Sequence, residues 1–126
     1  MIRSLPRKQV LRGHGAFTRI LGMGTALREG SVKLWYAPSR SSDSPKIGFA
    51  VTRALGDAVA RNRVKRCLRE AVRLHHDRFY QNTIPFDIVL MYVGSAVKRA
   101  GEIRCKDLER QVLSAFKRFM VRISDS

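Results

Sequence analysis

The stretch from Ala58 to Arg73 reads AVARNRVKRCLREAVR and carries six Lys or Arg residues against one acid. On a helix, at about 100° per residue, its basic and amide side chains share an arc of roughly 100°, opposite its apolar residues. The polar set is Asn62, Lys65, Arg66, Arg69 and Arg73, and the apolar set is Ala60, Val64, Cys67, Leu68 and Ala71. Packing explains the apolar set but not the aligned polar set. The stretch therefore predicts a helix with one face in a core and the other facing an anion.

The whole chain shares this basic character. It has 126 residues, 44% of them hydrophobic, and a net charge of +15 from 25 Lys or Arg and 10 Asp or Glu. This length predicts a single domain spanning residues 1–126, with residues 1–12 as a basic, flexible arm. Such a charge repels itself unless a polyanion neutralises it, so nucleic acid is the first candidate partner. An anionic membrane competes, but no transmembrane run, signal peptide or lipidation motif occurs, so we expect a soluble, cytoplasmic protein.

The region before residue 53 changes from a helical to an alternating pattern. Phe17, Ile20 and Leu21 have the spacing of a short amphipathic helix that ends near Gly22, with His14 at the surface as its cap. Alternation from residue 25 to residue 52 then predicts three strands. In the second, Val32, Leu34 and Tyr36 share the core face and Lys33 and Trp35 the other; in the third, Ile47, Phe49 and Val51 face the core. The opposite face, with Gly48 and Ala50, is small enough to form a shallow floor for a ligand.

The rest of the chain predicts a helix, a strand and a final helix. Asp57 is the expected N-cap of the central helix, which should run to about Phe79. The apolar run from Phe86 to Val93 is typical of an interior strand, with Asp87 as its only charge. The last helix has one apolar stripe, made of Leu108, Val112, Ala115, Phe116, Phe119 and Ile123. The fold class is therefore α+β: a two-layer sandwich of helices on a four-stranded sheet, in αβββαβα order.

Cysteines and histidines offer few candidate ligands. Cys67 and Cys105 lack CxxC spacing, so we expect small buried hydrophobic residues rather than a disulfide or a metal site. His75 and His76 are expected to be one half-buried and one solvated histidine. The acidic residues show no clustered spacing that would hold two divalent metals, and no phosphate loop, nucleophile elbow or HExxH motif occurs. We therefore predict no catalytic residues and no protein metal site.

The basic surface is typical of RNA recognition rather than of reading duplex DNA. Arginine pairs bidentately with phosphates and stacks on bases, and it dominates the central stretch. Phe17 and Trp35 could stack on an unpaired strand if they border the small-residue face of the sheet. Core packing is the competing interpretation for each aromatic, and it is favoured for Phe17.

The segment from Ala58 to Glu70, AVARNRVKRCLRE, resembles the signature of the protein component of bacterial ribonuclease P. The resemblance extends over nearly the whole chain. It includes Phe17 in a basic helix, the Gly24-Thr25 pair, the strand IGFAVT at residues 47–52 leading into LGDAV, and the strand FDIV at residues 86–89. The resemblance implies a fold like ribosomal protein S5 domain 2, with a left-handed βαβ crossover, where general rules favour a right-handed one.

The family resemblance also implies a function. The catalyst is then the ribonuclease P RNA with Mg²⁺, held mainly by the RNA, and the small protein assists endonucleolytic removal of the 5′ leader of precursor tRNA. The implied partners are that RNA and precursor tRNA, with one protein per RNA and no obligate protein partner. The implied RNA-docking residues are Arg61, Asn62, Arg63, Lys65, Arg66, Arg69 and Arg73. The implied leader-binding residues are Phe17, Lys33, Trp35, Lys46 and Arg53.

Three departures from the family pattern affect the implied leader site. Leu21 stands where a second aromatic is usual, and Ala54 follows Arg53 where a second basic residue is common. Tyr92 and Val93 stand where basic residues often follow the fourth strand. These changes predict weaker leader binding, or binding that depends more on Trp35 and the arm. Two alternative functions remain: a ribosomal or RNA-chaperone-like RNA-binding protein, and a metal-dependent nuclease acting alone.

Overall fold

A computed structural model describes residues 14–38, 46–75, 86–98 and 100–124. The basic arm and His76 lie outside these residues. The helices are α1 (His14–Met23), α2 (Ala58–Leu74) and α4 (Cys105–Ser124), with short 3₁₀ turns η2 (Arg53–Leu55) and η3 (Ala100–Glu102). The strands are β1 (Thr25–Glu29), β2 (Val32–Pro38), β3 (Ile47–Val51) and β4 (Phe86–Tyr92). The predicted αβββαβα order is confirmed.

The four strands form one mixed sheet in the order β1-β2-β4-β3. β4 is the interior strand that its continuous apolar run predicts, since it pairs antiparallel with β2 and parallel with β3. Two parallel strands need a long crossover connection, which α2 supplies between β3 and β4. The sheet therefore brings residues from both halves of the sequence side by side.

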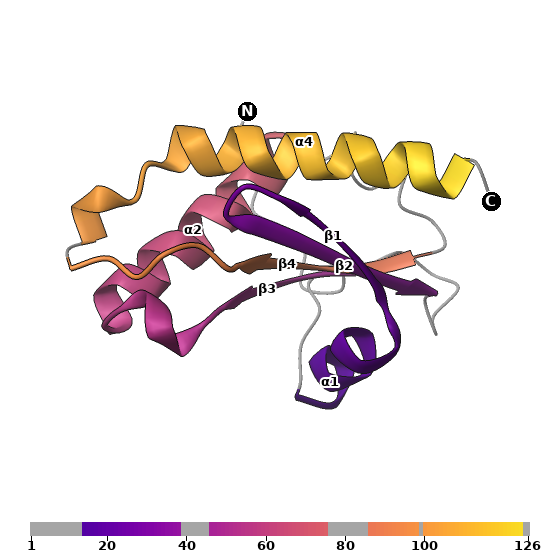
Figure 1. The fold of residues 1–126 in the computed structure, drawn as a ribbon, viewed down its shortest axis with the longest axis horizontal. Helices are drawn as coiled ribbons and strands as arrows, with labels where there is room; N and C mark the ends of the chain where they lie inside the picture. Colours follow the sequence, from indigo (N-terminus) through magenta and orange to yellow (C-terminus); the bar gives the residue numbers. More distant parts are fainter. Residues whose placement is uncertain (1–13, 39–45, 76–85, 99, 125–126) are drawn as a thin grey trace.

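Helices cover both faces of the sheet. α2 and α4 pack on one face, while α1 lies against the other, below the sheet in Figure 1. The larger core lies under α2 and α4, and its fully buried side chains include Leu34, Val64, Ile88 and Phe119. A smaller core under α1 is built on Ile20, Ala37 and Val89. One face of the sheet is therefore covered by two helices over the larger core, and the other face by α1 over the smaller core.

Glycines are required at two tight connections, the entry from α1 into β1 and the turn from β1 to β2. A Cβ at Gly24 would lie 2.4 Å from the carbonyl oxygen of Ile20 and 2.8 Å from that of Tyr36, so only glycine fits between α1 and β1. Gly30, with φ of 59°, is the first residue of the two-residue turn that joins β1 to β2. A positive φ at this position is typical of a hairpin turn, and glycine adopts it without strain.

Asp57 is the N-cap of α2, as predicted. Its carboxylate Oδ1 accepts a hydrogen bond of 2.9 Å from the backbone N–H of Ala60. The helix ends at Leu74, earlier than the predicted end near Phe79, and His75 is its C-cap. The prediction was too long because apolar periodicity cannot show where backbone geometry changes. The His75 ring lies 3.2 Å from the carboxylate of Glu109 and is half-buried, as expected.

The expectation that both cysteines stay unpaired is wrong. Cys67, in the middle of α2, and Cys105, the first residue of α4, form a disulfide with a Cα–Cα distance of 5.0 Å. This distance lies in the usual disulfide range. The two residues are 38 positions apart, so only the packing of α4 onto α2 brings them together. The disulfide joins the arginine-rich helix covalently to the C-terminal helix.

None of the helices in the described ranges is both long and apolar enough to cross a membrane.

Candidate nucleic-acid interface

The outward face of α2 carries the aligned basic side chains that the sequence predicts for this helix. Asn62, Lys65, Arg66 and Arg69 are all exposed, while the predicted apolar set of the helix is buried. The N-cap at Asp57 fixes the first turn, and the core contacts of Val64 and Leu68 fix the rotation of the helix about its axis. Arg69 also lies over the ring of Phe49, 5.6 Å from its centroid, a typical cation–π distance. These side chains are therefore positioned by a rigid element.

Two arginines of the same stretch have partners within the protein. Arg63 donates from Nε and Nη2 to the backbone oxygen of Ile103, at 3.1 and 3.0 Å. Arg73 forms an ion pair with Glu70, and only 12% of the Arg73 side chain is exposed. Arg61 is half-exposed. The predicted RNA-docking set thus divides into freely exposed side chains and side chains held by the fold, which helical spacing alone does not distinguish.

The second candidate surface lies on the α1 side of the sheet, where strand register aligns residues in rows. Trp35 of β2 lies opposite Val89 of β4, which lies opposite Gly48 of β3. The next row contains Lys33, Met91 and Ala50, all half-exposed. Gly48 is buried and Ala50 is half-exposed, so the expected shallow floor is open at Ala50 and covered at Gly48.

Trp35 lies at the border of the smaller core. Its side chain packs against this core together with Phe17 and Leu21, and Lys33 Nζ lies 4.5 Å from the centre of its ring. The indole Nε1 is buried and has no hydrogen-bond partner among the described residues. Buried indole N–H groups normally have a partner, so this donor is energetically unsatisfied. Trp35 is thus packed against a core and still partly exposed.

Arg19 and Asp87 fix α1 on this face. Asp87 is 4% exposed and accepts hydrogen bonds from Arg19 Nη2 and from the backbone N–H of Lys46, each at 3.0 Å. Arg19 Nη1 also donates to the carbonyl oxygen of Pro38 at 3.2 Å. The Arg19–Asp87 pair therefore connects α1 to the ends of three strands, with Asp87 in β4 and bonded next to β3, and Arg19 bonded to the end of β2.

The remaining predicted leader-binding residues do not converge. Lys46 and Arg53 flank β3 at its opposite ends, and Arg53 is exposed in η2. The structure thus brings Phe17 and Trp35 to one cluster, with Lys33 beside Trp35, and neither Lys46 nor Arg53 is a member of that cluster. Met91 shares a row with Lys33 on this face of the sheet, but it was not among the predicted leader-binding residues. The alternation of Asp87, Val89 and Met91 along the fourth strand is a signal that could have identified it.

Metal ligands do not gather in the part of the chain that is described. No group of three or more His, Cys, Asp or Glu residues there is arranged to hold a metal ion.

Comparison with known sequences points to one family. The model of the Ribonuclease P family matches residues 5–120. The ribonuclease P protein component of Pelotomaculum thermopropionicum is 28% identical over 109 residues, 86% of this chain and 90% of that protein. The protein of the same name from Syntrophus aciditrophicus is 39% identical over 66 residues, 52% of this chain and 53% of the relative. The family model and the Pelotomaculum relative therefore each match most of this chain, whereas the Syntrophus relative matches about half of it.

Solved structures agree with this result. The ribonuclease P protein of Thermotoga maritima is 26% identical, with a TM-score of 0.65 over 86% of this chain and 96% of that one. The Staphylococcus aureus protein is 20% identical, with a TM-score of 0.69 over 86% and 93% of the two chains, a likeness that shows the fold. The predicted α+β, S5 domain 2-like fold class is thereby confirmed. Because the family model matches almost the whole sequence, the chain belongs to the ribonuclease P protein family.

Proposed function

We propose that the chain is the protein subunit of ribonuclease P, which binds the catalytic RNA and assists removal of the 5′ leader of precursor tRNA. The observation that carries this proposal is the exposed face of α2 in a chain of this family. Asn62, Lys65, Arg66 and Arg69 line one side of a helix whose other side is buried. Hydrogen bonds from Lys and Arg to phosphates are charge-assisted and therefore stronger than neutral ones.

The α1 side of the sheet is the proposed leader site. A single-stranded leader offers unpaired bases and phosphates, and single-strand binding combines stacking on aromatic rings with nearby cations. Trp35 supplies the aromatic surface and Lys33 the cation, while Ala50 leaves room beside them. Phe17 contributes its exposed part from α1. The absence of an aromatic at Leu21 removes one stacking surface from this site.

In this proposal the chemistry belongs to the RNA. Mg²⁺ held by the RNA subunit supplies the activated water for phosphodiester hydrolysis when it is bound. The protein binds and orients: α2 docks on the catalytic RNA, and the α1 side of the sheet holds the leader. No protein side chain acts as an acid, base or nucleophile in this assignment.

The test is reconstitution with a transcribed bacterial ribonuclease P RNA at low Mg²⁺. We expect precursor tRNA to be cleaved at the mature 5′ end by the RNA, and the protein to increase the rate. Three controls are RNA alone, protein alone, and a precursor without a leader. Cleavage by the purified protein alone would favour an independent nuclease. Equal binding to unrelated RNAs, without stimulation of cleavage, would favour a general RNA-binding protein.

A further inference from the structure

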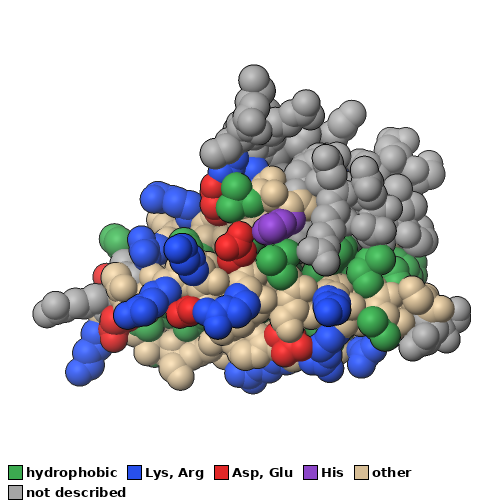
Figure 2. All heavy atoms as spheres, turned by 90° about the horizontal axis from the view of Figure 1, so that it is seen from above, with side chains coloured by type: hydrophobic (Ala, Val, Ile, Leu, Met, Phe, Trp, Pro, Cys, Tyr) green, Lys and Arg blue, Asp and Glu red, His purple; other side chains and the backbone are tan. Residues whose placement is uncertain are grey.

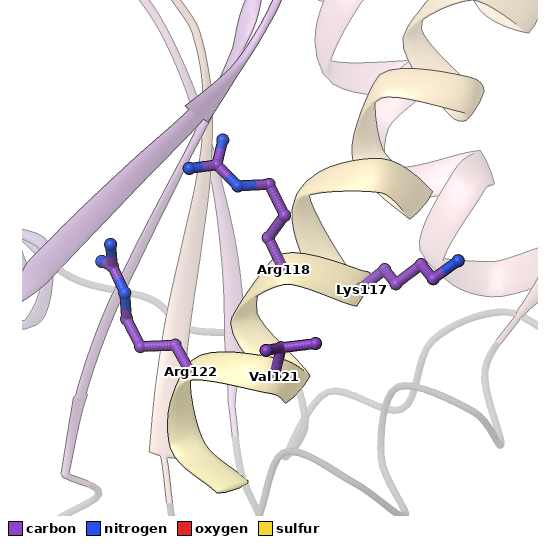
Figure 3. A pocket seen from close by; sticks show the side chains of 4 residues that line it. All are labelled: Lys117, Arg118, Val121 and Arg122. Carbon is purple, nitrogen blue, oxygen red and sulfur yellow. The ribbon is translucent and has the colours of Figure 1, made fainter. Parts of the chain in front are cut away.

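A second basic surface lies on the C-terminal half of α4. A shallow pocket of about 450 Å³ opens there, and the described residues that line it are Lys117, Arg118, Val121 and Arg122. In Figure 3, Arg118 and Arg122 extend from α4 in one direction, Lys117 extends to the other side, and Val121 lies between them. We call these four residues the α4 pocket. Three of its four lining side chains are cationic.

The charges of the α4 pocket are only partly compensated. Arg118 Nη1 lies 3.4 Å from Oε1 of Glu29 in a half-exposed pair, which is worth little in water. Among the described residues, neither Lys117 nor Arg122 forms an ion pair with a carboxylate. Arg118 and Arg122 are one helical turn apart, so their like charges repel each other. An anion bound between these side chains would relieve that repulsion.

Two of these cations are held in place by the backbone of β1. Arg118 Nη1 donates to the carbonyl oxygen of Arg28 at 2.8 Å, and Arg122 Nη1 donates to that of Ala26 at 3.4 Å. A guanidinium has five N–H donors, so each arginine keeps donors for a second acceptor. The pocket therefore presents partly ordered cations, which lose less entropy on binding than freely moving side chains.

The α4 pocket is separate from the α2 face. α4 packs on α2 and is joined to it by the disulfide at Cys105, but the pocket lies 12 residues further along α4, about 18 Å at 1.5 Å per residue. Of the strands, α4 contacts β1 and β2 whereas α2 contacts β3, and β1 and β3 lie at opposite borders of the sheet. Four strands spaced about 4.8 Å apart put these borders about 14 Å from each other. Figure 2 looks onto the side covered by α4 and shows Lys and Arg side chains (blue) distributed along this face. A ligand that contacts both basic surfaces has to be an extended polyanion.

The side chains of the α4 pocket favour a nucleic acid over an anionic membrane as the bound polyanion. A membrane-binding helix presents a broad apolar face. The apolar stripe of α4, including Val112, Phe116 and Phe119, is buried in the core, and Val121 is the large apolar side chain that the pocket exposes. One apolar residue between cations suits the ribose and phosphate of a nucleotide chain. We propose that the α4 pocket is a second RNA-binding surface, which holds the phosphodiester backbone of the same catalytic RNA that docks on α2.

This inference rests on the proposed function, and its test measures the salt dependence of binding to transcribed ribonuclease P RNA. The full chain is compared with a variant that carries Lys117→Ala and Arg122→Gln. Glutamine keeps a polar side chain with N–H donors but removes the charge. Each phosphate contact contributes about 0.7 to 0.9 to the slope of log K against log salt, so the double variant should lose about 1.4 to 1.8. The variant Lys117→Arg with Arg122→Lys should retain the slope.

Arg110→Ala is the matched control, because Arg110 is an exposed cation of the same helix that pairs with Asp107. It should leave the slope nearly unchanged. If the double variant does not fold, Lys117→Ala alone should still lower the slope by about 0.7 to 0.9. An unchanged slope in a folded α4 variant, while the parent chain binds and stimulates the RNA, would overturn only this inference. A parent chain that does not bind the RNA would overturn the proposed function as well.

Equal losses for the RNA and for heparin, with no loss of RNA-dependent precursor cleavage at moderate salt, would indicate a nonspecific anion surface and also overturn the proposal.

Discussion

Arg19 and Asp87, 68 residues apart in the sequence, form a buried ion pair of 3.0 Å that attaches α1 to the sheet. The two side chains are only 12% and 5% exposed. The carboxylate also accepts from the backbone of Lys46, so three elements depend on one side chain. Because α1 carries Phe17 and packs beside Trp35, this pair sets the geometry of the proposed leader site.

Replacing Asp87 with Asn should therefore destabilise the fold strongly. The change leaves the Arg19 guanidinium buried without a counter-charge, which typically costs about 3 to 5 kcal/mol. The free energy of unfolding from denaturant titration measures the effect. Asp107→Asn is the control, because Asp107 and Arg110 form an exposed pair, and it should cost less than about 1 kcal/mol. Similar losses for the two variants would show that the Arg19–Asp87 pair is not structurally important.

The disulfide between Cys67 and Cys105 should contribute measurably to stability. Closing a loop of 38 residues restricts the unfolded chain, and such a cross-link typically contributes about 2 to 4 kcal/mol. A thiol reductant should lower the midpoint of denaturant unfolding of the parent chain. The variant with Cys67→Ala and Cys105→Ala should be insensitive to the reductant. Titration of two free thiols in the unreduced protein would contradict the disulfide.

The N-cap at Asp57 should stabilise α2. Asp57→Ala removes the acceptor for the Ala60 N–H and should cost about 0.5 to 2 kcal/mol of unfolding free energy. Asp57→Ser keeps an acceptor and should cost much less. Hydrogen exchange at the Ala60 amide is a local measurement of the same contact. Equal stability of the alanine and serine variants would show that this side chain does not cap the helix.

The exposed and the internally paired arginines of α2 should differ in RNA binding. Replacing Arg66 and Arg69 with Ala should lower the slope of log K against log salt by about 1.4 to 1.8 for two phosphate contacts. Arg73→Ala should change the slope less, because Arg73 is mostly buried and paired with Glu70. Filter binding over a salt series measures both. A larger effect at Arg73 would reverse the assignment of the exposed face.

Trp35→Ala should weaken binding of leader-containing precursor more than binding of mature tRNA. One lost stacking contact corresponds to about 1 to 3 kcal/mol per base. Trp35→Phe keeps an aromatic face and should retain part of the preference for the precursor. Competition binding between the two RNAs measures the difference. Equal loss for precursor and mature tRNA would assign Trp35 to core packing alone.

Periodicity in the sequence predicted most of the elements because each amphipathic element buries one face. The apolar stripe of the last helix is an example: Leu108, Val112 and Phe119 are all buried. The interior position of β4 followed from its continuous apolar run in the same way. The spacing of apolar residues within one helix or strand is a local property, so it can be read from the sequence without knowing the rest of the fold.

Contacts between distant residues were not predictable in this way. The pairing of Cys67 with Cys105 depends on how α4 lies across α2, and the pairing of Arg19 with Asp87 depends on the side of the sheet that α1 covers. Helical spacing also placed Arg73 on the polar arc without showing that Glu70 neutralises it. The resemblance to the family implied a role for each residue. Which of these side chains are free to contact a ligand could be seen only in the folded structure.

The arginines of the α4 pocket have a consequence for self-association. β1 borders the sheet, and the unpaired carbonyls of a border strand can pair with a strand of a second molecule. Arg118 and Arg122 already occupy the carbonyls of Arg28 and Ala26, so an incoming strand would have to displace two guanidinium groups. Intermolecular β-sheet growth is therefore disfavoured at this border, which helps a chain of this composition to stay dispersed at high concentration.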